Sequence, residues 1–521
     1  MSPRRFWIAA AATVSAAIAM RVPFRSHYLH SWDSANYALA MERIDIATHR
    51  PHPPGYVGYV MAARGLDAVL RDPNAALVCW NIIAASLIAL LVLRIAWDLA
   101  PQQPRPVLFV AAATSLVMTS PLLWFYSEVA EIYPSELLGT LVLGFCAWRT
   151  AQGDRRGLFH LAVAIPLVAF FKLTAALLML PLAAWAWRAG SRRDRVRAGA
   201  LLAACAVLGA GVVLATTPGL TDIIWNQFVV STSSSRVLAA GDSDILQRFN
   251  RNARDTLTAG VSTLGVVNVF ALMAWMIRDR RLPAGIGRWT ALFWAGPWLF
   301  LCVVVHIGKP GYILPILPVA ALILAGFYAR LSTRIGIALV VIQATLNVAQ
   351  FVLLRPFPDS LTGGRQPYRS KSLSARIASD LQLLTFGTAA TISETDEAVR
   401  LVLFTAERLC PSRDLVVIAA LDPIDARRAM WHLPAATVVH TEGPSVVATG
   451  RHGTFREVTE ETPPITTACP VLWLAADDKP FDLAVPPAAR HEPGVGFVLP
   501  PGTIRLAPAA IVFEYPRAGT K

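Results

Sequence analysis

Long apolar runs alternate with short polar segments over the first two thirds of the chain. A helix that crosses the hydrocarbon core of a membrane needs about 20 mostly apolar residues. Runs that meet or approach this length lie at about 6–22, 75–97, 106–124, 132–149, 198–216, 257–277, 289–305, 312–330 and 335–354, and two shorter ones fit into 158–187 on either side of Lys172. The pattern predicts an α-helical polytopic membrane protein with about eleven transmembrane helices.

The pattern changes after about residue 354. The remaining residues are more polar and proline-rich, and strand signals alternate with helix signals along them. The expected elements are strands at 414–421, 435–441, 470–475 and 509–515, a short helix at 423–432, and a hairpin at 445–458. The sequence therefore predicts two domains, a membrane domain at 1–354 and an α/β domain at 355–521.

Composition and charge sharpen this prediction. The chain has 521 residues, 55% of them hydrophobic and 16% charged, and its mean hydropathy is +0.49. These values exclude an ordinary soluble globular protein. The net charge of +13 would suit a nucleic-acid-binding protein, but the arginine clusters fall on alternate loops, as the positive-inside rule requires. We therefore expect a cytoplasmic N-terminus and no nucleic-acid partner. The segments expected outside are 23–74, 125–131, 217–256, 306–311 and everything after about 355.

The first apolar run has the features of a signal peptide, since Arg4 and Arg5 precede an alanine-rich core. No clean small-x-small site precedes a mature start, so an uncleaved signal-anchor is favoured over cleavage near Ala19. Cys410 and Cys469 both fall in the external domain, where a disulfide between them could form in an oxidising compartment.

Two external loops are long, 23–74 and 217–256, and the first carries most of the polar chemistry. Asp33 follows the first span closely and is therefore expected at the membrane–water boundary. A carboxylate in a partly desolvated pocket is a candidate general base. The structural alternative, given equal weight, is that Asp33 caps a helix at 34–46.

A proline-rich corner follows in the same loop, at His52-Pro53-Pro54-Gly55-Tyr56. Paired prolines hold the chain extended, and the glycine permits a tight turn. The corner could be a rigid connection without chemistry. It would nevertheless return His52 and Arg50 toward the helix that carries Asp33.

Two further external turns carry charged residues close to the membrane. Glu128 and Glu131 are three residues apart and would share one face of a helical turn. Carboxylates so close to lipid are costly unless they are paired or functional. Two glutamates could also bind a divalent cation, although without a third ligand they are a weak metal signal.

The second turn is His306-Ile307-Gly308-Lys309-Pro310-Gly311-Tyr312, and a span follows it at once. The chain has only five lysines, and a lysine ammonium is a compact phosphate-binding charge. Snorkelling toward water is the structural alternative. Function is favoured for Lys309, while Lys172 is left open between the two.

With these positions assembled, residues 1–354 resemble the GT-C glycosyltransferases, the polytopic class that uses polyprenyl-phosphate sugars. The similar branches are the bacterial dolichyl-phosphate-mannose-protein-mannosyltransferase-like and lipopolysaccharide-core-type enzymes. The resemblance rests on Asp33 after the first span, the Pro53-Pro54-Gly55 turn, the Glu128/Glu131 turn, and Gly308–Tyr312 leading into a span. Each motif is loose alone, and their order and common side make the combination specific.

The resemblance implies a cell-envelope enzyme of the bacterial inner membrane with its active site and C-terminal domain on the periplasmic or extracellular side. It would move a hexosyl or pentosyl group, with inversion, from a polyprenyl-phosphate carrier to a hydroxyl of a lipid, glycan or protein. Asp33 would be the catalytic base. Lys309, His306, Arg50 and Tyr312 would hold the donor phosphate, and His52, Pro54 and Gly55 would support the loop.

One departure from the pattern concerns the residue after Asp33. Many relatives carry Asp-Glu where this chain has Asp33-Ser34. The role of that second carboxylate is therefore missing, or it has moved to Glu42, Asp45 or Glu128, and metal dependence is left open.

Two other functions are compatible with a polytopic chain. A transporter or lipid flippase would need ionisable residues at mid-membrane depth and related halves with broken helices. Here the polar residues gather on one side, and the sequence has no evident repeat. A non-catalytic member whose external domain binds cell-wall glycan is the weaker rival.

Overall fold

The computed structural model describes residues 2–52, 55–217, 245–305, 309–355, 387–412, 415–419, 423–441, 445–475, 488–507 and 510–514. The chain divides into two compact units. The first comprises Met1–Arg25 and Tyr56–Thr391, and the second comprises Ser26–Gly55 and Ile392–Lys521. Each unit is described by itself below.

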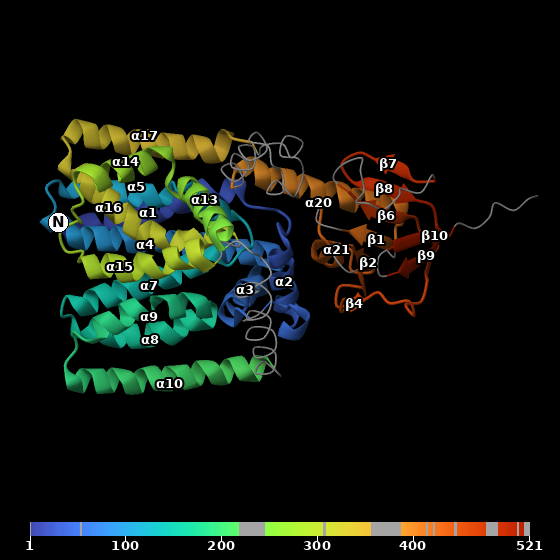
Figure 1. Cartoon of the computed structure of the whole chain (residues 1–521), viewed down its shortest axis with the longest axis horizontal. Helices are drawn as coiled ribbons and strands as arrows, with labels where there is room; N and C mark the ends of the chain where they lie inside the picture. The colour runs from blue at the N-terminus through green and yellow to red at the C-terminus, as the bar shows by residue number, and fades with distance from the viewer. Residues whose placement is uncertain are drawn as a thin grey trace, which may run out of the picture. The chain divides into compact units, whose positions relative to one another are not determined.

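The first unit is helical, and most of its helices run side by side along one direction (Figure 1). The helices are α1 (Pro3–Arg21), α3 (Val57–Leu70), α4 (Pro73–Leu99), α5 (Pro106–Met118), α6 (Pro121–Glu128), α7 (Tyr133–Ala151), α8 (Arg155–Phe171), α9 (Leu173–Trp187), α10 (Arg192–Thr216), α13 (Ile245–Leu264), α14 (Val266–Arg278), α15 (Arg288–Phe300), α16 (Leu317–Arg330) and α17 (Thr333–Leu353). Short helical turns lie at η1 (Val22–Phe24), η3 (Ala100–Gln102), η5 (Leu301–Val305) and η6 (Pro310–Ile316). Every one of the expected apolar segments thus coincides with helical structure.

The expected number of spans, about eleven, is not confirmed. Within the described part of the chain, six helices are long and apolar enough to cross a membrane, and eight if two bent pairs each count as one span. The difference arises because α7 carries charged residues within its length and α8 and α9 are short. The finding supports a multi-pass membrane protein without fixing the number of crossings.

Two predicted spans are bent helix pairs rather than straight helices. α5 and α6 meet at 48°, and α13 and α14 meet at 110°. At the second break Gly265 has φ +82°, and a Cβ there would lie 1.8 Å from the Asn347 side-chain oxygen. Only glycine allows this backbone geometry so close to a neighbouring helix. The apolar segment predicted at 257–277 is therefore two helices that meet at Gly265.

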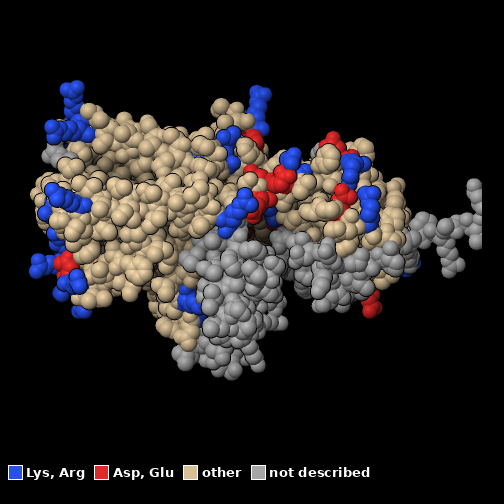
Figure 2. Space-filling view, turned by 90° about the horizontal axis from the view of Figure 1, so that it is seen from above, with Lys and Arg blue, Asp and Glu red and all other residues tan. Residues whose placement is uncertain are grey.

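In the view of Figure 2, few charged side chains lie along the flank of the first unit, and a group of them, mostly Lys and Arg, lies at its left-hand end. Arg149 from the end of α7 lies 2.6 Å from Asp154 before α8 and 3.9 Å from Asp98 at the end of α4. Arg330 at the end of α16 pairs with Asp279 after α14 at 2.5 Å. The basic loops predicted on alternate connections therefore meet at one end of the helices.

The second unit contains a sheet of seven strands in the order β4-β3-β2-β1-β6-β8-β7. β1 pairs in parallel with β2 and with β6, and the remaining neighbours are antiparallel. A smaller sheet has the order β10-β9-β5. The strands are β1 (Val416–Ala419), β2 (Thr437–His440), β3 (Val446–Thr449), β4 (Arg456–Glu457), β5 (Ile465–Thr467), β6 (Val471–Leu474), β7 (Arg490–Glu492), β8 (Gly496–Leu499), β9 (Gly502–Ala507) and β10 (Ala510–Glu514).

Each face of the larger sheet is covered by a different layer. One face packs against α20 (Ala389–Leu409) and α21 (Ala426–His432), with Val417 and Val438 buried among Val402 and Ala429. The opposite face packs against the small sheet through Trp473, which is 2% exposed. The predicted strands, short helix and hairpin of the C-terminal region are confirmed, and the unit is α/β as expected.

The segment Ser26–Gly55 from the first long loop belongs to this second unit. It forms α2 (Trp32–Glu42) and the 3₁₀ turn η2 (Ile46–Thr48), and α2 packs against α21. The Asp396 carboxylate of α20 accepts the backbone N–H groups of His27 and Tyr28 at 2.8 and 3.1 Å. The hydropathy pattern gives no indication of this grouping.

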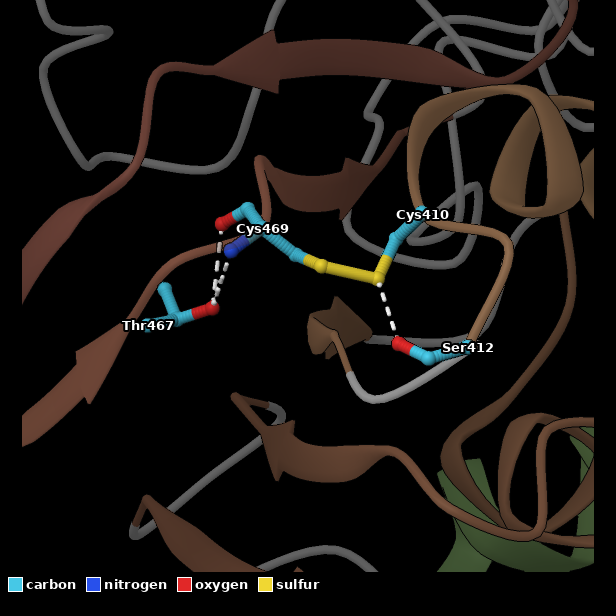
Figure 3. Close-up of a disulfide and its surroundings, with 4 residues drawn as sticks. All are labelled: Cys410, Ser412, Thr467 and Cys469. Atoms are coloured by element: carbon cyan, nitrogen blue, oxygen red, sulfur yellow. Dashed lines mark hydrogen bonds between the residues drawn. A yellow bond between two sulfur atoms is a disulfide. The ribbon is translucent and has the colours of Figure 1, made fainter.

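A disulfide joins Cys410, just after α20, to Cys469, just before β6 (Figure 3). The Cys469 N–H donates to the Thr467 hydroxyl, and the Cys410 sulfur lies 3.1 Å from the Ser412 hydroxyl. The cross-link therefore ties the end of α20 to the large sheet.

Candidate functional site

Asp33 lies in the first turn of α2, but it does not cap the helix. The cap is Ser31, whose hydroxyl accepts the Ser34 N–H at 3.2 Å. The helix runs over Trp32–Glu42 rather than 34–46 as expected. Because the cap is already provided, the capping interpretation of Asp33 is wrong. Its Oδ1 instead lies 3.5 Å from His52 Nδ1, an ion-pair distance when the imidazole is protonated.

A tight backbone loop brings His52 back to α2. The backbone N–H of Asp45 donates to the Arg50 carbonyl at 2.7 Å, and the Arg50 N–H donates to the Asp45 carbonyl at 2.8 Å. His49 occupies the left-handed region at φ 59° inside this loop. The expectation that the chain folds back toward Asp33 is thus confirmed, and the closure comes from the Asp45–Arg50 bridge.

Arg50 itself is held by the C-terminal residues of the same unit. It is 4% exposed, and its guanidinium donates to the Gly453 carbonyl at 2.7 Å. Burial lowers the pKa of Arg50, and the Asp45 and Glu42 carboxylates oppose that shift. Glu42 in turn lies 2.9 Å from Arg451 and 3.2 Å from His452.

The structure describes only some of the remaining residues predicted for this site. Gly55 has φ +112° and donates its N–H to the His52 carbonyl at 3.1 Å, so the turn that required a glycine is present. Pro54 and His306 lie outside the described residues, as does most of the loop predicted at 217–256.

In the first unit, Lys309 and Glu131 form an ion pair, with Nζ 3.2 Å from Oε1. The Glu131 side chain is 4% exposed, whereas that of Lys309 is 37% exposed. The Asn81 amide of α4 donates to the backbone carbonyls of Val129 and Glu131 at 2.7 Å each and so fixes this turn. A cation held by a buried carboxylate but open to solvent can still meet an anionic ligand.

A second ion pair lies deeper in the same region. Lys172, 2% exposed, has its Nζ 3.5 Å from Glu136 Oε2. The ring centroids of Tyr56, Tyr133 and Tyr312 all lie between 5.1 and 5.3 Å from that ammonium. Buried charges require such pairing, and the aromatic faces add cation–π attraction. Lys172 therefore does not snorkel, which excludes the structural alternative considered for it.

Tyr312 enters this cluster because the chain approaches Tyr133 very closely. A Cβ on Gly311 would lie 2.4 Å from Tyr133 Cγ, so only glycine fits beside that ring. The rings of Tyr133 and Tyr312 stand edge to face, with centroids 5.4 Å apart. The Lys309–Tyr312 turn is therefore packed directly onto the start of α7.

Glu128 and Glu131 do not share a helical face, so that expectation is wrong. Helix α6 ends at Glu128, and Val129 is already extended. The Glu128 Oε1 accepts the Trp124 indole N–H at 2.5 Å, whereas Glu131 faces Lys309. Within the described residues, no three His, Cys, Asp or Glu side chains come together in an arrangement that could hold a metal ion.

Sequence reasoning missed Glu136 and undervalued Lys172. Glu136 is fully buried in the first turn of α7, inside a segment predicted to be apolar. An ionisable residue inside a predicted span is itself a signal of function or pairing. Only the fold shows that its partner lies some 36 positions further on, at the break between α8 and α9.

The fold is similar to two solved structures of ArnT from Cupriavidus metallidurans. The structure bound to undecaprenyl phosphate has a TM-score of 0.51 and 12% identity, covering 82% of this chain and 84% of that one. The apo structure has a TM-score of 0.51 and 13% identity, with 83% and 85% coverage. No protein-family model and no curated protein matches the chain. The chain therefore has the fold of ArnT, in agreement with the predicted helical membrane domain and C-terminal α/β domain.

Proposed function

We propose that this protein is a membrane glycosyltransferase that moves one sugar from a polyprenyl-phosphate donor to an acceptor hydroxyl. The GT-C fold supports this proposal, as does the binding of undecaprenyl phosphate by ArnT, which has the same fold. The observation that carries it is the Lys309 ammonium, 37% of whose side chain is exposed. Glu131 holds it just before the start of α7, at the end of that helix opposite Arg149.

The reaction is a single displacement that inverts the anomeric centre. The acceptor oxygen forms a bond to the anomeric carbon while the bond from that carbon to the phosphate oxygen breaks. The acceptor proton passes to the Asp33 carboxylate, and the polyprenyl phosphate leaves with the electron pair. His52 orients the carboxylate, and Lys309 stabilises the charge that grows on the phosphate, which is typically the largest catalytic contribution.

The distribution of arginine supports the proposed orientation. The basic loops meet at one end of the helices, and this end is cytoplasmic by the positive-inside rule. Lys309 and Glu131 then lie on the periplasmic or extracellular side of a bacterial inner membrane. The Cys410–Cys469 disulfide agrees with an oxidising compartment for the C-terminal residues.

The experiment is transfer by the full-length protein in nanodiscs, supplied with a panel of polyprenyl-phosphate sugars and followed by release of free polyprenyl phosphate. Asp33→Asn should reduce turnover by about three orders of magnitude, in line with loss of an essential base. Asp72→Asn is the matched control, since Asp72 only caps α4 and asparagine caps as well. Near-wild-type turnover of Asp33→Asn would refute the proposal for Asp33.

A further inference from the structure

The C-terminal residues of the second unit surround the segment that carries Asp33, and Arg427 is at the centre of their contacts. Arg427 lies in the first turn of α21 and is 3% exposed. Its Nη2 donates to the Thr48 carbonyl at 2.7 Å. The Thr48 carbonyl belongs to η2, four residues before His52.

The same guanidinium also contacts the start of α2. Its Cζ lies 5.6 Å from the centroid of the Trp32 ring and 4.8 Å from that of Phe455. The two rings are stacked at 6.0 Å with an interplanar angle of 14°. Trp32 directly precedes Asp33, so Arg427 touches both chain segments that supply the Asp33–His52 pair.

Asn36 links these two segments a second time. Its amide, fully buried, lies 3.0 Å from Trp32 Nε1 and 2.9 Å from the His49 carbonyl, so that it accepts from the indole and donates to the backbone. Burial and the neighbouring Arg50 together lower the pKa of Arg427 to about 10, with Asp425 opposing the shift. The guanidinium therefore remains charged at neutral pH.

We infer that Arg427 is a positioning residue for the transfer reaction. It fixes the start of α2 against η2, and it thereby sets the geometry between Asp33 and His52. This inference rests on the proposed function, because it acts through the Asp33 carboxylate. This positioning role would make the C-terminal residues part of the transfer reaction, rather than a separate glycan-binding domain.

An arginine is well suited to this task, and a lysine is not. A planar guanidinium can stack on one ring while it donates to a carbonyl in its plane, whereas an ammonium can do only one of the two well. A displacement of a catalytic group by about 1 Å can reduce rate by about 100-fold. Loss of the Arg427 contacts with Trp32 and Thr48 should therefore reduce turnover without altering donor binding.

The test compares Arg427→Gln, Arg427→Lys and the control Arg490→Gln in full-length protein in nanodiscs. Arg490 is an exposed arginine of β7, with 66% of its side chain accessible, and pairs only weakly with Glu492 at 3.4 Å. We expect kcat to fall about 10- to 100-fold in Arg427→Gln at unchanged donor KM, with a smaller loss in Arg427→Lys and none in Arg490→Gln. A kcat within twofold of wild type in Arg427→Gln would overturn the inference.

Two further measurements distinguish a failure of the positioning role from a failure of the proposed function. The double variant Asp33→Asn/Arg427→Gln should be no slower than Asp33→Asn alone, because both changes act on one group. If Arg427→Gln does not fold, Phe455→Leu removes one stacked ring and keeps the charge, and an unchanged kcat there would overturn the inference. An active Asp33→Asn would refute the proposed function, whereas an inactive Asp33→Asn with an active Arg427→Gln would refute only the positioning role.

Discussion

Asp33 Oδ1 lies 3.5 Å from His52 Nδ1, and the two residues are brought together by a backbone bridge between Asp45 and Arg50. An imidazole next to a catalytic carboxylate can orient it without taking up the substrate proton. We therefore expect His52→Gln to lower kcat by about 10- to 100-fold while the thermal unfolding temperature stays within error of wild type.

Transfer kinetics and a melting curve on the same preparation check this prediction. His491→Gln is the matched control, because His491 is an exposed histidine on the edge strand β7. A His52→Gln protein with wild-type kcat would mean that the proximity to Asp33 has no role in the reaction.

Lys309 offers a separate prediction about the donor. Replacing its ammonium with a thioether in Lys309→Met should weaken binding of undecaprenyl phosphate about tenfold or more, since a charge-assisted contact to phosphate is lost. Lys309→Arg should keep part of the affinity. Undecaprenol, which lacks the phosphate, is the control ligand, and its binding should not change. Equal losses for both lipids would point to a damaged lipid site instead of a lost phosphate contact.

The Lys172–Glu136 pair predicts a stability effect with an unusual rescue. Lys172→Met leaves Glu136 buried without its partner and should destabilise the protein by about 3–5 kcal/mol. The double variant Lys172→Met/Glu136→Leu should recover most of that loss, because an apolar pair of similar volume can replace a buried ion pair. Thermal denaturation in detergent measures both. A double variant as unstable as the single one would show that the packing of Tyr56, Tyr133 and Tyr312 depends on the Lys172 ammonium itself.

His432 predicts how the stability of the second unit depends on pH. Burial, with smaller contributions from Arg428 and Arg451, lowers the pKa of His432 from 6.5 to about 3. The unfolded chain therefore binds a proton that the folded unit excludes. The contribution to stability is complete above about pH 6.5 and is lost progressively as the pH falls from 6.5 toward 3, at about 1 kcal/mol by pH 5.5.

Hydrogen exchange of the β1 and β6 amides in the full-length protein at pH 7.5 and 5.5 measures this loss. His432→Gln should reduce the difference between the two pH values, and His491→Gln should leave it unchanged. The same acid sensitivity in His432→Gln as in wild type would assign it to other groups.

The sequence predicted most of the elements but not the way they assemble. Apolar length located the helices, and short continuous apolar runs located buried strands such as Val416–Ala419. The grouping of Ser26–Gly55 with residues after 392 escaped detection because it depends on contacts such as Arg427 with Thr48, far apart in the sequence. Hydropathy says nothing about such pairings.

For the candidate site, too, the sequence predicted several residues but not how they contact one another. The sequence indicated Asp33 as a carboxylate at the membrane boundary and His52 through the proline-rich corner that follows it. Glu131 stood out because a carboxylate is costly close to lipid, and Lys309 because its ammonium can bind phosphate. The sequence could not show that Ser31 caps α2, or that Glu131 rather than Glu128 faces Lys309. Both facts depend on where a helix begins or ends, and a shift of one or two residues changes which side chain is available.

The second unit draws its two parts from opposite ends of the polypeptide, with roughly 340 residues between Gly55 and Ile392. At a synthesis rate of about 5–20 residues per second, the earlier part waits on the order of 20–70 seconds for its partner to be made. During that interval Trp32 and the Thr48 carbonyl lack the arginine that holds them in the finished protein. Activity should therefore begin only when the last portion of the chain has been made and folded, so a nascent or truncated chain would carry the acidic residue without the contacts that position it.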